Sequence, residues 1–191
     1  MTPNTAKKYR RHRESVLVYG GDHLKTRLGR STPRPLSMGR TMHFVLKSTK
    51  ATGPWSFRTK KALIEAILEK FAQKHGVDLL NTAVQGNHLH LNLQVSAVRG
   101  YKRFIRAVTA AIAMAVTGAS RWNPLGIRFW DRRPFSRIVL TPSDEITVQN
   151  YVELNKLEAS GLSRTEARRL LSQKVAEESR RKIRILRCHT R

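Results

Sequence analysis

Apolar and polar residues alternate without a break from His88 to Val95. A side-chain period of two is typical of a β-strand that buries one face. The polar face of this strand would carry four side chains, those of His88, His90, Asn92 and Gln94. We therefore expect the two imidazoles to project side by side from one face of a strand.

Two further strands and two helices follow from the pattern of the surrounding residues. Alternation predicts a strand over 42–48, and an apolar run predicts another over 77–85. Because Gly86-Asn87 is a turn signal, the strand over 77–85 and the histidine strand should form a hairpin. Apolar residues at helical spacing predict helices over 60–75 and 99–117, each followed by a glycine.

The segment after the second helix combines a loop with a broken strand. Residues 119–126 are expected to form a loop because they contain Asn123-Pro124. Residues 129–140 are predicted to form a strand that Pro134 interrupts, with residues 138–140 as its firmest part.

Two helices complete the pattern. Thr141 followed by Pro142 is a helix start, and this helix is expected to run to about Ala159. Another helix begins at Ser163, which forms a capping box with Glu166. Without this last helix, which is expected to be a C-terminal extension rather than core, the order is strand, helix, strand, strand, helix, strand, helix. It predicts a ferredoxin-like α+β fold, in which helices cover one face of an antiparallel sheet.

The helix that begins at Thr141 carries a polar stripe between two apolar borders. At about 100° per residue, Tyr151 and Asn155 lie on this stripe, with Val148 and Val152 on one side of it. A polar stripe with apolar borders should face protein, so we expect Tyr151 and Asn155 to point inward together. One interpretation is a core tyrosine whose hydroxyl is hydrogen-bonded by Asn155 or a carbonyl. The other is a phenol that acts as a nucleophile toward phosphorus.

The second interpretation requires a cation that polarises the phosphate. His88 and His90 would supply part of its site, since two converging neutral imidazoles can bind a divalent metal. Asn155 would add a neutral oxygen. A hard ion such as Mg²⁺ or Mn²⁺ would leave coordination positions open for phosphate oxygens.

Charge indicates the kind of partner. The 191 residues include 37 Lys and Arg against 13 Asp and Glu, a formal net charge of +24. Such an excess attracts polyanions, and nucleic acid leads among them, although a purely structural RNA-binding protein would have the same composition. The excess is greatest toward the two ends, which suggests a basic arm over 1–40, a core domain over 41–162 and a basic helical extension over 163–191. A short apolar run over 16–19 is compatible with a strand in the arm.

Arginines and aromatic rings alternate around the broken strand. The nucleic-acid-binding candidates there are Arg128, Trp130, Arg132, Arg133 and Arg137, and Arg40 joins them from the end of the basic arm. Rings stack on the bases of single-stranded nucleic acid while guanidinium groups meet phosphates. An edge strand whose aromatic side chains belong to the core would give the same pattern.

Two absences bear on the compartment. Cys188 is the only cysteine, which excludes an internal disulfide. No apolar run approaches the length needed to cross a membrane. We expect the protein to work in a reducing cytoplasm, associated with the nucleoid, and without a membrane partner.

Several motifs between about residue 38 and residue 162 occur together. They are Met42-His43-Phe44-Val45-Leu46, Gly86-Asn87-His88-Leu89-His90-Leu91, Phe129-Trp130-Asp131, Phe135-Ser136-Arg137, and Tyr151-Val152-Glu153-Leu154-Asn155 leading to Gly161-Leu162. In this combination the chain resembles the HUH single-tyrosine transposases, and most closely the REP-associated tyrosine transposases. Lys156 and Glu158 depart from the family pattern, in which a proline and a basic residue are common.

The resemblance implies a metal-dependent endonuclease and strand transferase that acts on single-stranded DNA near a hairpin or palindromic repeat. Tyr151 would form a 5′-phosphotyrosine intermediate, and His88, His90 and Asn155 would hold Mg²⁺ or Mn²⁺. The basic arm and the Arg-rich end resemble the DNA-binding extensions of members of this family. The REP-associated branch tends to act as a monomer rather than a homodimer.

Two other kinds of function compete with this one. One is a zinc hydrolase or a histidine-triad nucleotide hydrolase. The triad type requires a third histidine where Asn92 stands, and a structural zinc site requires more soft ligands. A non-catalytic nucleic-acid-binding protein on a retired transposase core explains the charge, but it leaves the histidine strand and the inward tyrosine unexplained. Cleavage that depends on Tyr151 would separate this last interpretation from the transposase.

Overall fold

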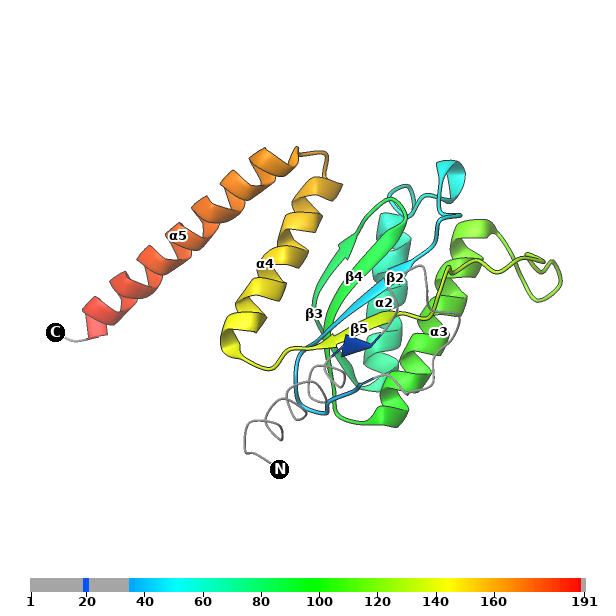
Figure 1. The fold of residues 1–191 in the computed structure, drawn as a ribbon, viewed down its shortest axis with the longest axis horizontal. Coiled ribbons are helices and arrows are strands. Elements are labelled where there is room, and N and C mark those ends of the chain that lie inside the picture. Colours follow the sequence, from blue (N-terminus) through cyan, green and yellow to red (C-terminus); the bar gives the residue numbers. More distant parts are fainter. Residues whose placement is uncertain (1–18, 21–34, 190–191) are drawn as a thin grey trace, which may run out of the picture.

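The computed structural model describes residues 19–20 and 35–189 (Figure 1). In chain order the elements are β1 (Tyr19–Gly20), β2 (Met42–Lys47), the 3₁₀ helix η1 (Gly53–Trp55), α2 (Lys61–His75), β3 (Val77–Val84), β4 (His88–Val95), α3 (Val98–Thr117), β5 (Phe135–Ile138), α4 (Pro142–Ala159) and α5 (Arg164–His189). The strand expected over 16–19 lies mostly outside the described residues, and β1 contains its last position.

The strands form one antiparallel sheet in the order β1-β5-β2-β4-β3. β3 and β4 form the predicted hairpin. β2 lies between β4 and β5, so α2 and α3 each connect strands that are not neighbours in the sheet. This arrangement of β2, β3, β4 and β5 is that of the ferredoxin-like fold, and the predicted α+β class is confirmed.

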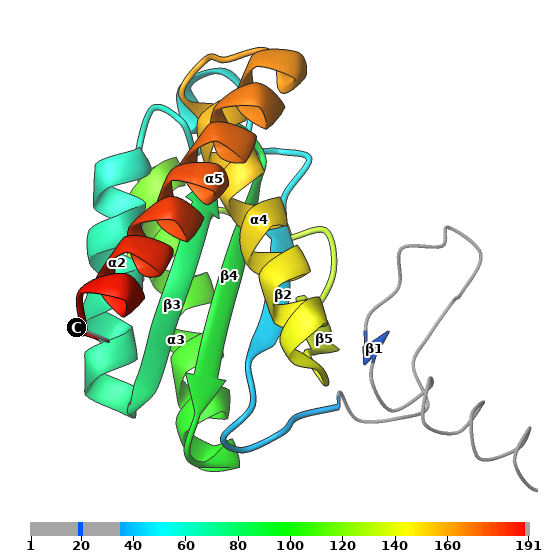
Figure 2. The same ribbon diagram turned by 90° about the vertical axis from the view of Figure 1, so that its left-hand side faces the viewer.

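Helices cover both faces of the sheet (Figures 1 and 2). α2 and α3 pack on the face that carries the odd-numbered side chains of β4, and the apolar core lies there. α4 packs against β3 and β4 on the opposite face. The sequence predicts all helices of the core on one face of the sheet. This is correct for α2 and α3, whereas α4 covers the other face. α4 has an apolar stripe of its own, including Val148 and Val152, that must also be removed from water.

The helix ends agree with the predicted signals. Gly76 ends α2 with a φ of 62°, a conformation that glycine adopts without steric strain. At the start of α4, the hydroxyl of Thr141 accepts a hydrogen bond from the backbone N–H of Asp144 at 3.1 Å. At the start of α5, Ser163 and Glu166 form the predicted capping box.

The strand predicted over 129–140 is wrong in its extent. The structure forms only β5 within it, which begins after Pro134 and ends at Ile138. Proline has no N–H for the ladder, and before it the backbone N–H of Asp131 still donates to β2, to the carbonyl of Lys47 at 3.1 Å. Oδ1 of Asp131 accepts hydrogen bonds from the backbone N–H and the hydroxyl of Thr49, at 2.8 and 2.9 Å.

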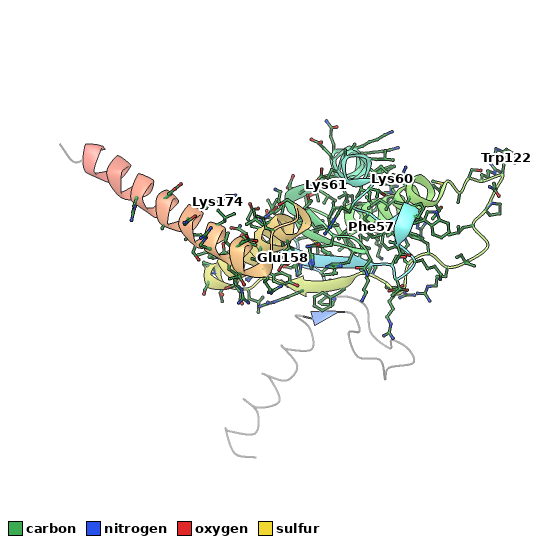
Figure 3. All side chains as sticks on the ribbon, turned by 90° about the horizontal axis from the view of Figure 1, so that it is seen from above. Phe57, Lys60, Lys61, Trp122, Glu158 and Lys174 are labelled. Atoms are coloured by element: carbon green, nitrogen blue, oxygen red, sulfur yellow. The ribbon has the colours of Figure 1, made fainter. Side chains whose placement is uncertain are left out.

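α5 packs on α4 and then extends away from the sheet (Figure 1). Arg164 pairs with Glu158 at 3.0 Å, and Lys174 pairs with Glu153 at 3.3 Å. Figure 3 shows the labelled side chains of Glu158 and Lys174 on this pair of helices. None of the helices in the described ranges is long and apolar enough to cross a membrane.

Candidate active site

The polar face of β4 lies beneath α4 rather than in water. His90 and Asn92 are only 3% and 0% exposed. On the neighbouring strand β2, His43 is 6% exposed and lies opposite Asn92. Buried polar groups are unfavourable unless they are hydrogen-bonded or otherwise engaged, so this layer is a candidate functional site.

His43 and His90 form a stacked pair at the centre of this layer. Their ring centroids are 5.4 Å apart and their planes differ by 6°. Nε2 of His43 lies 3.2 Å from Nδ1 of His90, so one of these nitrogens donates a hydrogen bond to the other. The other ring nitrogen of His90, Nε2, is buried and has no hydrogen-bond partner among the described residues.

His43 is a site residue that the sequence interpretation missed. The available signal was a histidine on the face of strand 42–48 opposite Phe44 and Leu46. The alternation in this strand indicates the face on which His43 lies. Its position beside His90 depends on the pairing of β2 with β4, in which Val45 lies opposite His90.

His88 lies next to His90, as the strand periodicity predicts. The ring centroids are 4.9 Å apart and the planes are nearly perpendicular, at 82°. Nδ1 of His88 is 2.9 Å from the side-chain oxygen of Asn87. Because this oxygen can only accept, the proton of a neutral His88 resides on Nδ1 and the lone pair on Nε2.

Burial favours the neutral forms of the His88 and His90 imidazoles. Desolvation, assisted by the neighbouring His43 and His88, lowers the pKa of His90 from 6.5 to about 3. Desolvation and the charge of Lys47 lower the pKa of His88. Neutral imidazole is the form that binds a metal ion.

The buried neutral state of His90 predicts a loss of stability in mild acid. The pKa of His90 is about 3 in the folded chain, against an ordinary value of 6.5, so the unfolded chain binds more protons between these values. We expect the free energy of unfolding to decrease as the pH falls below about 6.5, by about 2 kcal/mol at pH 5. Urea unfolding in metal-free buffer at several pH values measures this. The non-titrating variant His90→Asn should show a weaker dependence, and an equal dependence in both proteins would contradict the assignment.

Tyr151 reaches this layer from α4. Its ring centroid lies 5.3 Å from that of His90 and 5.9 Å from that of His43, with interplanar angles of 87° and 81°. The phenol ring therefore stands edge-on against the histidine pair. The fold thus brings together His43, His90 and Tyr151, which are far apart in the sequence.

Tyr151 is less buried than expected. It is 42% exposed, whereas Asn155 is 6% exposed. Val148, Val152 and Asn155 follow each other at spacings of four and three residues and form the buried stripe of α4, so Tyr151 lies at its edge. An edge position gives the phenol contact with the imidazoles on one side and access to solvent on the other.

The side chain of Asn155 is hydrogen-bonded to Tyr151 and Gln85. Its Nδ2 donates to the main-chain carbonyl of Tyr151 at 2.7 Å, and its Oδ1 accepts a long hydrogen bond of 3.4 Å from Gln85. Gln85 also donates to the main-chain carbonyl of Asn155 at 2.6 Å. Within the described ranges, the Asn155 side chain has no hydrogen bond to His88 or His90.

The donor atoms fit the predicted metal ion in part. Nε2 of His90 is a buried lone pair without a partner among residues 19–20 and 35–189, and Nε2 of His88 also carries a lone pair. No group of three or more His, Cys, Asp or Glu side chains in those ranges could hold a metal ion. A third protein ligand would therefore be an amide oxygen, and Oδ1 of Asn155 carries only its long hydrogen bond from Gln85.

The arginine candidates have different surroundings. Arg137 lies in β5 and pairs with Asp144 at 2.8 Å, and Arg40 donates a hydrogen bond to the carbonyl of Leu140 at 3.1 Å. Both contacts fasten the start of α4 to the sheet. Three other candidates are exposed on the segment that precedes β5, namely Arg128, Arg132 and Arg133.

Trp130 is a packing residue rather than an open stacking surface. Its indole N–H donates to the carbonyl of Thr109 at 2.9 Å. The rings of Phe57 and Phe129 lie 5.6 and 5.2 Å from it. This agrees with the alternative in which the aromatic side chains of this segment belong to the core. In the same connection between α3 and β5, the exposed aromatic ring is that of Trp122.

Solved structures include two similar folds. A REP-associated tyrosine transposase bound to a REP hairpin superposes with a TM-score of 0.55 and 13% identity, over 68% of this chain and 74% of that one. A crystal structure from Deinococcus radiodurans R1, provisionally described as a transposase, gives a TM-score of 0.41 and 17% identity, over 68% of this chain and 98% of that one. No family model and no curated protein matches the chain. The first similarity shows the fold that the motif resemblance implies.

Proposed function

We propose that the chain is a transposase-like enzyme that cleaves single-stranded DNA near a hairpin or palindromic repeat, with Tyr151 as its nucleophile. The observation that carries the proposal is the contact of the Tyr151 ring with the buried pair of His43 and His90. A fold shared with a transposase that is bound to a REP hairpin supports it. The net charge of +24 supports a polyanionic substrate.

In the proposed reaction, Oη of Tyr151 attacks the phosphorus of a DNA phosphodiester. The bond from Oη to phosphorus forms as the bond from phosphorus to O3′ breaks. The phenolic proton passes to solvent on the exposed side of the ring, and the departing O3′ takes up a proton. The products are a 5′-phosphotyrosine and a free 3′-hydroxyl. Because one phosphoester replaces another, attack by a 3′-hydroxyl can rejoin a strand.

His88 and His90 would hold Mg²⁺ or Mn²⁺ through their Nε2 atoms, with Oδ1 of Asn155 as a third ligand. Few protein ligands suit a hard cation that keeps positions open for phosphate oxygens. When bound, the cation would polarise the scissile phosphate and stabilise the charge on the leaving oxygen.

His43 would act as a positioning residue that sets the tautomer of His90. For Nε2 of His90 to bind a cation, the proton of this ring must reside on Nδ1. Nδ1 then donates to Nε2 of His43, 3.2 Å away. Hydrogen bonds of this kind orient metal-binding histidines and raise their basicity.

Replacing His43 by leucine should therefore weaken Mn²⁺ binding by about 10- to 100-fold. His43→Gln should retain more affinity, because its side-chain oxygen can accept a hydrogen bond from His90. Electron paramagnetic resonance of Mn²⁺ on a Tyr151→Phe background measures binding without cleavage. Equal Mn²⁺ affinities in His43→Leu and in the background protein would contradict the positioning role.

A non-catalytic nucleic-acid-binding protein is the second candidate. The observation in its favour is that no group of three or more His, Cys, Asp or Glu side chains in the described ranges could hold a metal ion. A retired active site would retain the charge and the fold without a working ligand set.

A covalent adduct separates the two candidates. The full chain is incubated with single-stranded oligonucleotides from the DNA that flanks its gene, including any hairpins, in the presence of Mg²⁺ or Mn²⁺. A denaturing gel detects the adduct, and mass spectrometry identifies the modified peptide. A nucleotide attached to Tyr151 supports the transposase-like reaction. Salt-sensitive binding without an adduct supports the binding protein.

A further inference from the structure

The connection between α3 and β5 presents an exposed aromatic ring at its tip. Trp122 is 88% exposed, a larger fraction than for any other large apolar side chain in the described ranges. Figure 3 shows it at the outer edge of the molecule. An indole ring offers a large apolar face and is well suited to burial against a partner.

Hydrogen bonds define the turn that carries this ring. The hydroxyl of Ser120 accepts from the backbone N–H groups of Trp122 and Asn123, at 3.2 and 3.0 Å. The backbone N–H of Ser120 donates to the carbonyl of Asn123 at 3.0 Å. The guanidinium carbon of Arg121 lies 5.4 Å from the centre of the indole ring. The turn therefore presents an aromatic ring and a cation together.

The base of the same connection is fastened to the sheet. Nζ of Lys50 donates to the carbonyl of Arg128 and the hydroxyl of Ser48 donates to the carbonyl of Phe129, both at 2.6 Å. Phe129 is itself 5% exposed and belongs to the core. A ligand bound at the tip would thus be held in a defined place relative to the sheet.

Charge around the ring selects the class of ligand. Residues 118–134 contain four arginines and a single acidic residue, Asp131, whose carboxylate accepts two hydrogen bonds from Thr49. The residues on either side of Trp122, Arg121 and Asn123, are polar, which favours a charged partner over a membrane or an apolar protein surface. A cationic loop with one open ring matches a nucleotide, which offers a base to stack and a phosphate to neutralise.

We propose that Trp122 is a stacking site for an unpaired base of single-stranded DNA, at a nucleotide remote from the phosphate that Tyr151 attacks. The choice of DNA rests on the proposed function. The remoteness follows from the fold, because the loop projects beyond α3 while α4 lies on the other side of the sheet (Figures 1 and 3). Bases within a stem are covered by their neighbours, so the ring requires a nucleotide in a single-stranded flank or loop.

Fluorescence anisotropy with the full chain tests this site on two labelled probes, a hairpin with single-stranded flanks and a blunt duplex without unpaired bases. Trp122→Ala should weaken binding to the flanked hairpin by about 5- to 150-fold, the effect of losing one stacked base. Trp122→Phe should recover most of this loss because it retains a ring. Ile127→Ala is the matched control, since Ile127 is a 52% exposed apolar residue of the same loop. It should bind as the wild type does.

The salt dependence gives a second readout. Trp122→Ala should lower the affinity at every salt concentration without changing the slope of log affinity against log salt, because no phosphate contact is removed. Wild-type affinity of Trp122→Ala for the flanked hairpin would overturn the proposal. An equal loss on the flanked hairpin and the blunt duplex would overturn it as well.

The outcomes are distinguishable from those of the cleavage proposal. A selective binding loss in Trp122→Ala without any adduct on Tyr151 would keep the stacking site and reject the reaction. An adduct on Tyr151 with unchanged binding by Trp122→Ala would keep the reaction and reject the stacking site.

Discussion

Tyr151→Phe is expected to abolish strand cleavage and adduct formation while leaving DNA binding nearly unchanged. The substitution removes the attacking oxygen, and loss of a nucleophile lowers turnover by roughly 10⁴-fold or more. The phenyl ring can keep the edge-on contacts with His43 and His90, and the ring is 42% exposed, so the fold should tolerate the change. Single-turnover cleavage on denaturing gels and anisotropy with the same oligonucleotide measure the two effects.

A matched variant shows whether the effect belongs to this tyrosine. Tyr101 lies in the apolar core on the other face of the sheet, where its ring centroid is 5.1 Å from that of Phe44. Tyr101→Phe loses the same hydroxyl group away from the histidine layer and should cleave as the wild type does. Cleavage by Tyr151→Phe at the wild-type rate would exclude Tyr151 as the nucleophile.

His90→Asn should produce the second large effect, a loss of metal-dependent cleavage of at least about 100-fold. The asparagine amide can occupy the region of Nδ1 and keep a hydrogen bond to His43, but it has no atom in the place of Nε2. The variant therefore removes the candidate metal donor while preserving a polar partner in the buried layer. Cleavage rates measured against Mn²⁺ concentration, together with Mn²⁺ binding, test this expectation.

Two further variants make this test specific. His90→Gln carries an oxygen that can reach the region of Nε2, and it should retain more metal dependence than His90→Asn. His75→Asn removes an imidazole from α2, where the ring lies 6.1 Å from that of Phe71, and should have no effect on cleavage. If His90→Asn cleaved like the wild type in dilute Mn²⁺, His90 would not be a metal ligand.

Local interactions explain which parts of the fold could be predicted from the sequence. The strict alternation from His88 to Val95 determines that the two imidazoles project on one side of β4, since the period of two belongs to any extended strand. Gly76 and Thr141 determine helix ends through hydrogen bonds with residues a few positions away. The order of these elements was sufficient to predict the ferredoxin-like fold.

Non-local packing explains where the predictions were wrong or incomplete. The strand predicted over 129–140 is reduced to β5 because the main chain pairs with β2 only from Phe135 to Ile138, while Asp131 bonds to Thr49 on another segment. The amphipathic pattern of α4 indicated that one side is buried, but it did not show which face of the sheet covers it. Trp122 and Trp130 both lie in the Arg-rich connection between α3 and β5, and burial distinguishes the packed ring of Trp130 from the exposed ring of Trp122.

The candidate site shows the same division between sequence and tertiary structure. The sequence by itself determined that His88 and His90 share a face and that Tyr151 and Asn155 lie one helical turn apart, because these relations depend on backbone geometry within one element. Only the tertiary structure placed His43 against His90, from 47 residues away, and the Tyr151 ring against both. Strand periodicity specifies the face of a side chain but not the register of its neighbours, which is set by the packing of the whole sheet.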